Sequence, residues 1–201
     1  METEAMYFYF LSWVCWIIVT FMMQKSALRT FSSIVLLLII IGSTSNFSIF
    51  SFEVSGSFIV LIIAAIILLV KTLKENYFLH YFSITTISLA YVCFIIYEIF
   101  DPVWILINRT WILAFIMVYL TLLLFKKRDE RFVFMLCGLI QGELLNSFVL
   151  NSVFSYSVMG EISFLAVLFL ASAGLGVWLL FATITVHLDS VIQKRVKERQ
   201  G

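Results

Sequence analysis

The sequence predicts an all-α fold: a polytopic membrane protein built as a bundle of seven transmembrane helices, with the N-terminus outside and the C-terminus in the cytoplasm. Composition is the first reason. Of 201 residues, 63% are hydrophobic and 12% are charged, whereas soluble proteins average about 45–50% apolar and about 25% charged residues. A bilayer accommodates such a chain, because its hydrocarbon core, about 30 Å thick, accepts helices of about 20 apolar residues.

The second reason is that seven apolar segments follow one another, each bounded by charged residues or by a polar cluster. In chain order these segments are 5–23, 31–50, 57–73, 77–100, 103–125, 132–157 and 162–186. The connections between them are short, so we expect one seven-helix transmembrane domain over 1–186 and a basic cytoplasmic tail over 187–201.

The positions of lysine and arginine are the third reason, because short cytoplasmic loops carry an excess of both. All 13 basic residues except Arg109 follow the first, third, fifth or seventh segment. This alternation requires an odd number of spans and places the N-terminus outside.

Local signals justify the individual spans. Glu2 and Glu4 precede the first apolar segment, an order opposite to that of a cleavable signal peptide, so the segment is interpreted as a retained span. Pro102 stands where it can open the fifth span in its first turn. Most tyrosines fall towards the ends of spans, as expected of interfacial residues, and Tyr91 alone falls near a midplane.

The sixth segment carries the acidic residue that lies deepest in the predicted membrane, Glu143, together with Gln141 and Asn146. An isolated ionised carboxylate is costly there, so Glu143 is expected to face the protein interior and to be neutral, or paired with a cation or several donors. One interpretation makes it a ligand for an ion or solute, with Gln141, Asn146 and Arg109 as further candidate ligands. The other makes it a hydrogen-bonded packing residue between helices.

Arg109, on the outer side, has two sets of candidate partners. A long side chain in the outer third of the membrane can reach towards Glu143. Glu98 and Asp101 lie across the preceding outer turn, so the alternative is an ion pair with those acids or snorkelling to the interface.

Small residues predict a close helix pair. Gly138 and Gly142 form a GxxxG motif, and Ser172 and Gly176 form a matching small-xxx-small motif in the seventh segment. Counting depth from the inner ends sets Gly142 level with Gly176, and Asn146 level with Ser172. We therefore expect the sixth and seventh helices to pack closely on each other.

No metal or cofactor site is predicted. Cys15, Cys93 and Cys137 all fall within apolar segments, and His80 and His187 lack further ligands at usable spacing. No hydrolase or nucleotide-binding motif occurs, so we expect a protein that is not an enzyme. A net charge of +1 does not indicate a nucleic-acid partner.

The chain resembles the YphA-like family of small multi-pass membrane proteins from spore-forming Gram-positive bacteria. The resemblance rests on the aromatic opening YFYFLSWVCW, the GxxQGE stretch from Gly138 to Glu143, and the basic C-terminal tail. It implies a bacterial cell-membrane location and carries no known activity.

Two functions from different classes remain open at this point. The first is a non-enzymatic role through contacts with other membrane proteins or with the lipids of the bilayer. Anionic headgroups would then meet the basic inner turn of Lys126, Lys127, Arg128 and Arg131. The alternative is a small-solute or ion- or proton-coupled transporter that uses Glu143 near the middle of the membrane. An intramembrane enzyme is a third and weaker option.

Overall fold

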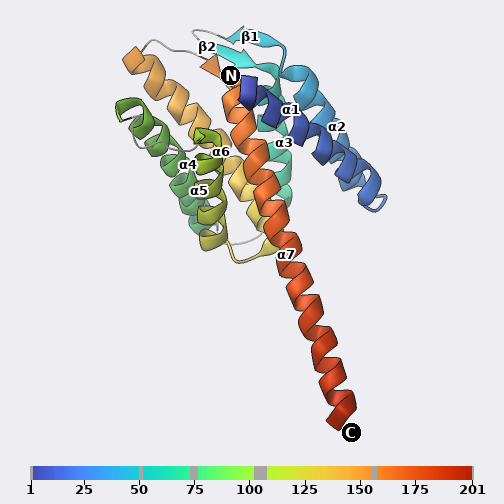
Figure 1. Cartoon of the computed structure of the whole chain (residues 1–201). Helices are drawn as coiled ribbons and strands as arrows, with labels where there is room; N and C mark the ends of the chain where they lie inside the picture. The colour runs from blue at the N-terminus through green and yellow to red at the C-terminus, as the bar shows by residue number, and fades with distance from the viewer. Residues whose placement is uncertain (1, 50–51, 73–76, 102–107, 155–157, 201) are drawn as a thin grey trace.

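The computed structural model describes residues 2–49, 52–72, 77–101, 108–154 and 158–200 (Figure 1). Seven α-helices account for most of these residues, which confirms the prediction of a helical fold. Their bounds are α1 Glu2–Ile17, α2 Ala27–Gly42, α3 Gly56–Thr72, α4 Tyr77–Phe100, α5 Arg109–Leu124, α6 Arg128–Phe154 and α7 Ile162–Gln200. A π-helical turn, η1 (Ile18–Met22), continues α1.

Four of the helical segments are long and apolar enough to cross a membrane by themselves: Glu2–Met22, Tyr77–Phe100, Glu130–Val153 and Ile162–Leu188. The other three, α2, α3 and α5, are apolar but have only 16 or 17 residues. Their rise of about 24–26 Å falls short of a hydrocarbon core about 30 Å thick.

A small sheet was not predicted. Strands β1 (Asn46–Ile49) and β2 (Phe52–Ser55) pair antiparallel, and β3 (Val158–Met159) pairs parallel with β2. The expected second span, 31–50, is therefore wrong at its C-terminal end, because α2 ends at Gly42 and β1 begins at Asn46. Hydroxyl groups explain the ending: Ser43 Oγ donates to the carbonyl of Ile40 at 2.8 Å and thereby satisfies a terminal group of the helix.

The other helix bounds follow the predicted spans closely except at two ends. Helix α5 begins at Arg109, where the side chain of Asn108 caps the helix by accepting from the Thr110 amide at 3.0 Å. The predicted residues 103–107 of that span lie outside the described part of the chain. Helix α7 continues without a break through the predicted tail as far as Gln200.

The helices are arranged around α6 and α7. Helix α6 packs most extensively against α4 and also against α3, whereas α7 packs against α1 and α5. The sheet lies at the end of the bundle where the N-terminus lies, and α7 projects from the opposite end (Figure 1). Buried apolar side chains from several helices fill the centre, among them Phe8, Phe58, Phe134, Phe164 and Leu175.

Candidate functional site

Glu143 lies on α6, about 16 Å along the helix from its last residue, Phe154. Its side chain is 5% exposed. The hydroxyl of Tyr91 on α4 donates to Glu143 Oε2 at 2.8 Å, and the backbone amide of Gly160, just before α7, donates to Oε1 at 3.1 Å. The carboxyl group therefore joins three separate parts of the chain, and each of its oxygens has a donor.

Gly160 supplies its amide from a backbone conformation that favours glycine. Its φ is 73°, in the left-handed region. A Cβ at this position would also meet the side chain of Phe58. The amide donor to Glu143 is thus fixed by a turn that other residues would strain.

Two glycines of α6 bring α4 close enough for Tyr91 to reach Glu143. A Cβ on Gly142 would lie 2.9 Å from Tyr91 Cδ1, and a Cβ on Gly138 would lie 2.7 Å from Ile87 Cγ2. The GxxxG motif therefore marks a close helix approach, as predicted, but with α4 as the neighbour.

The predicted packing of Gly142 and Asn146 against Gly176 and Ser172 is wrong. A Cβ on Gly176 would meet nothing within 4 Å among the described residues, and Ser172 Oγ donates to the carbonyl of Leu168 in its own helix at 2.7 Å. Depth counting placed the residues at matching heights but could not give the rotation of each helix about its axis. Helix α7 turns its small residue Gly174 towards Val118 of α5 instead.

Asn146, almost one turn after Glu143 on α6, is 6% exposed, and its Oδ1 has no hydrogen-bond partner among the described residues. Its neighbour Ser147 is 1% exposed and donates to the carbonyl of Val158 at 3.3 Å. A buried polar atom without a partner costs free energy unless water or a ligand satisfies it. Asn146 Oδ1 therefore needs a hydrogen-bond donor that the described residues do not supply, and Glu98 Oε2 and Arg109 Nε are likewise without a hydrogen-bond partner among them.

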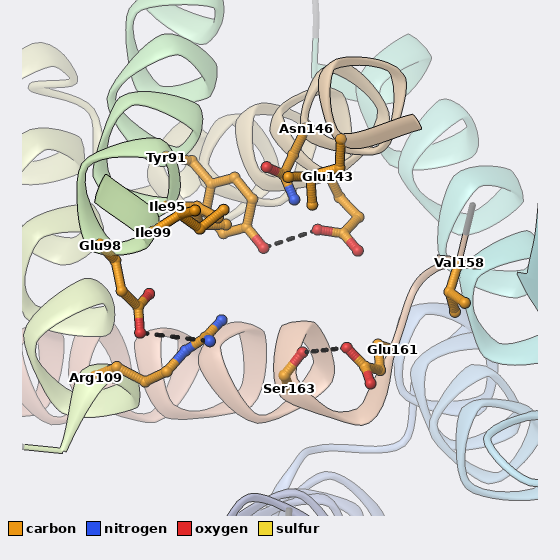
Figure 2. Close-up of a pocket in the computed structure, with 11 residues that line it drawn as sticks. Tyr91, Ile95, Glu98, Ile99, Arg109, Glu143, Asn146, Val158, Glu161 and Ser163 are labelled. Carbon is orange, nitrogen blue, oxygen red and sulfur yellow. Dashed lines mark hydrogen bonds and ion pairs between the residues drawn. The ribbon is translucent and has the colours of Figure 1, made fainter. Parts of the chain in front are cut away.

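These groups line a pocket of about 400 Å³. In Figure 2 the amide of Asn146 lies beside the Tyr91 and Glu143 pair, and Glu161, Ser163 and Arg109 lie on the facing side. Ser163 Oγ donates to Glu161 Oε2 at 3.2 Å. The lining is made of Tyr91, Ile95, Glu98, Ile99, Arg109, Glu143, Asn146, Leu150, Val158, Glu161 and Ser163.

Arg109 lines the same pocket as Glu143 but forms its ion pairs with other acids. Its guanidinium lies 3.5 Å from Glu98 Oε1 and 3.9 Å from Glu4 Oε1. Of the partners considered from sequence, the structure supports Glu98, at the end of α4. Glu4 on α1 was not foreseen. Arg109 thereby connects the N-terminal ends of α5 and α1 with the C-terminal end of α4.

Gln141 does not line the pocket. Residues two positions apart on a helix point in nearly opposite directions, since each residue turns the helix by about 100°. Glu143 and Asn146, three positions apart, share a face and both reach the pocket. The sequence prediction that grouped Gln141 with them is therefore wrong.

Four polar residues of the pocket were not identified from sequence as site residues: Tyr91, Glu98, Glu161 and Ser163. A signal existed for Tyr91, whose position near a midplane departs from the interfacial distribution of the other tyrosines. Glu98 and Glu161 lie near helix ends, where acidic residues are ordinary, so neither was expected to line a site, and Glu98 was considered only as a partner of Arg109.

The basic inner turn is held largely by its own contacts. Arg131 Nε donates to the carbonyl of Phe125 at 2.7 Å, Lys127 Nζ lies 3.0 Å from Glu130 Oε1, and Arg128 donates to Thr183 Oγ1 at 3.2 Å.

The described residues contain no group of three or more potential metal ligands.

Taken together, the pocket offers hydrogen-bond acceptors and carboxyl groups in excess of donors, within a cavity the size of a small solute. Apolar side chains of Ile95, Ile99 and Leu150 complete its walls. The arrangement is suited to holding a small polar molecule.

Comparison with known proteins places the chain in a family without assigning an activity. The family model for YphA-like integral membrane proteins matches residues 4–201. An uncharacterised protein, YphA of Bacillus subtilis (strain 168), is 26% identical over 200 residues, which cover 98% of this chain and 97% of that protein. No solved structure matches the chain. The chain therefore belongs to the YphA-like integral membrane protein family.

Proposed function

We propose that this protein spans the cell membrane seven times, with its N-terminus outside and its C-terminus in the cytoplasm, and binds a small polar solute in the Glu143 pocket from the outer side. The observation that carries the proposal is the combination of a pocket of about 400 Å³ with the buried, unpartnered Oδ1 of Asn146. A dry helix contact would leave that atom uncompensated, whereas water or a bound solute would satisfy it.

Charge placement supports the seven spans and their direction. All lysines and arginines except Arg109 follow odd-numbered predicted spans. The short helices α2, α3 and α5 fit a bilayer if it thins locally or if flanking residues reach the interface, both of which cost little. In this orientation Glu98, Arg109 and Glu161 lie towards the outer surface, and the Arg109 side chain, 37% exposed, marks the rim of the pocket.

We propose binding rather than catalysis. The described residues that line the pocket include no histidine, cysteine or lysine, and the hydroxyl of Ser163 donates to Glu161 without a histidine base beside it. Transport is a natural use of a carboxyl group at this depth, since intramembrane acids commonly mark ion and substrate pathways.

A second role, through other membrane proteins or lipids, is favoured by a separate feature. An apolar groove of about 1080 Å³ runs between α5 and α7, lined among others by Trp111, Phe115, Gly174 and Trp178. In a bilayer such a groove accepts acyl chains or a partner helix. At the inner turn, exposed Lys126 and Lys127 would attract anionic headgroups, whereas Arg131 is committed to the carbonyl of Phe125.

Cysteine accessibility tests the pocket. In a background with Cys15, Cys93 and Cys137 replaced by alanine, Asn146→Cys is expected to react with a membrane-impermeant methanethiosulfonate reagent added to intact cells. Leu139→Cys is the matched control, because Leu139 lies on the same helix, is 0% exposed and does not line the pocket. Equal protection of both cysteines would refute an aqueous pocket.

Flux through proteoliposomes tests transport. A carrier that uses Glu143 would lose solute uptake in Glu143→Gln, whereas the matched variant Glu130→Gln, at the other end of α6, would retain it. Uptake that is unchanged in Glu143→Gln would contradict a carrier that depends on this residue.

A further inference from the structure

We infer that the Glu143 pocket accepts a small organic cation with protonated amino groups, an alkylamine or a diamine. This inference rests on the proposed solute-binding function and names the class of solute. It follows from the charge, the hydrogen-bonding capacity and the shape of the pocket.

The charge balance of the pocket is negative. Glu98, Glu143 and Glu161 line it together with a single basic residue, Arg109. Carboxylates outnumber the guanidinium even when Glu143 is neutral. A ligand that carries positive charge therefore compensates the pocket, and an anion is repelled.

The charge of Arg109 is already compensated by acids of the protein, which weakens its attraction for the carboxylate of an amino acid or another anion. Glu98 Oε1 lies 3.5 Å from its guanidinium and Glu4 Oε1 lies 3.9 Å away, so two acids already compensate this one cation. Arginine is the residue that would normally recognise a ligand carboxylate. The pairing therefore disfavours zwitterions relative to simple amines.

The hydrogen-bonding capacity of the pocket also favours a cation. Three buried polar atoms of the lining residues have no hydrogen-bond partner among the described residues: the acceptors Asn146 Oδ1 and Glu98 Oε2, and the donor Arg109 Nε. The hydroxyl hydrogen of Tyr91 is committed to Glu143, and that of Ser163 to Glu161. The unpaired acceptors of the pocket thus outnumber its unpaired donor, and an ammonium group, with three donors and no acceptor, complements the acceptors.

The shape of the pocket favours an amine with a short carbon chain. Figure 2 shows acceptors on two facing sides, Glu143 and Asn146 on one and Glu161 on the other. Ile95, Ile99 and Leu150 offer apolar contacts for the methylene groups between them. The described residues bring together no three metal-ligating side chains, so an organic cation suits the pocket better than a transition metal.

Isothermal titration calorimetry on the purified full-length protein in detergent tests the inference at constant ionic strength. The probes are putrescine, butylamine, γ-aminobutyrate and 1,4-butanediol, which have similar size but differ in charge. We expect putrescine or butylamine to bind the native chain and Glu130→Gln, with affinity about tenfold or more weaker in Glu143→Gln and Glu161→Gln. Two pocket variants are used so that a folding defect in one leaves the other informative.

Several results would contradict the inference. Binding of γ-aminobutyrate as tightly as putrescine would overturn the preference for a simple cation while leaving the solute pocket intact. Equal binding of 1,4-butanediol, a loss in Glu130→Gln as large as in Glu161→Gln, or no binding of either amine would also overturn the inference. Labelling of Asn146→Cys tests, independently of these results, whether the pocket is accessible to water.

Discussion

The hydroxyl of Tyr91 on α4 and the carboxyl group of Glu143 on α6 lie 2.8 Å apart, oxygen to oxygen, in the interior of the bundle. Tyr91 is 2% exposed and Glu143 is 5% exposed, so the pair is buried in the protein where it forms part of the pocket wall. In a low-dielectric interior such a bond is strong, and loss of one partner leaves the other costly to bury. The pair therefore couples the most extensive helix contact of the bundle to its candidate binding pocket.

Tyr91→Phe is predicted to lower the free energy of unfolding by about 1–3 kcal/mol, because Glu143 Oε2 loses its donor while remaining buried. Unfolding in mixed detergent and dodecyl sulfate micelles measures the change. Tyr119→Phe serves as the control, since Tyr119 is 57% exposed on α5. An equal loss in both variants would show that the Tyr91 hydroxyl has no special role.

Gly142→Ala is predicted to destabilise the bundle by about 1–3 kcal/mol, because the added Cβ would lie 2.9 Å from Tyr91 Cδ1 and push α4 away from α6. Gly176→Ala is the matched control. It is predicted to be neutral or to stabilise α7 by up to about 1 kcal/mol, since its Cβ meets nothing within 4 Å and alanine favours helix. Thermal unfolding in detergent distinguishes the two variants. A large loss of stability in Gly176→Ala would support the contact between α6 and α7 that was expected from sequence.

Local patterns predicted the helices well because each helix satisfies its own backbone and is bounded by charged or polar residues. The small sheet escaped prediction because β1 and β2 are only four residues each, and β3 joins them from more than 100 residues further along the chain. Glu143 and Asn146 could be selected as buried polar residues of one span. Their partners Tyr91 and Gly160 could not, because helix rotation and neighbour choice depend on contacts distant in sequence.

Arg109→Glu is predicted to impair folding, because it places a third acid beside Glu98 and Glu4. Adding Glu98→Arg should recover part of the loss, a coupling of about 1 kcal/mol for a partly exposed pair. Fluorescence-detected size-exclusion chromatography of the folded fraction measures both. The combination Arg109→Glu with Glu143→Arg should give no recovery, and recovery there would mean that Arg109 pairs with Glu143 after all.

Asn146→Leu is predicted to leave the free energy of unfolding within about 0.5 kcal/mol of the native value, or to raise it, because Oδ1 has no hydrogen bond to lose. Ser147→Ala, at the next position, should cost about 1 kcal/mol, since its hydroxyl donates to the carbonyl of Val158. Chemical unfolding in detergent compares them. A larger loss for Asn146→Leu than for Ser147→Ala would indicate that Asn146 stabilises the fold rather than serving a ligand.

The seven-span topology predicts that the two ends of the chain lie on opposite sides of the membrane, and epitope tags on intact cells test this directly. The short helices α2, α3 and α5 are the ones for which a membrane crossing most needs a direct test, so single cysteines beside them are more informative than the tags alone.

In the cysteine-free background, Thr44→Cys after α2 should react with an impermeant maleimide from outside, because the preceding inner turn carries Lys25 and Arg29. Gln24→Cys before α2 and Lys127→Cys after α5 should react only after the membrane is permeabilised. All three positions are exposed, so protection can be attributed to the membrane. Labelling of Gln24→Cys and Thr44→Cys from the same side would mean that α2 does not cross, and the alternation of charge that supports the orientation would then fail.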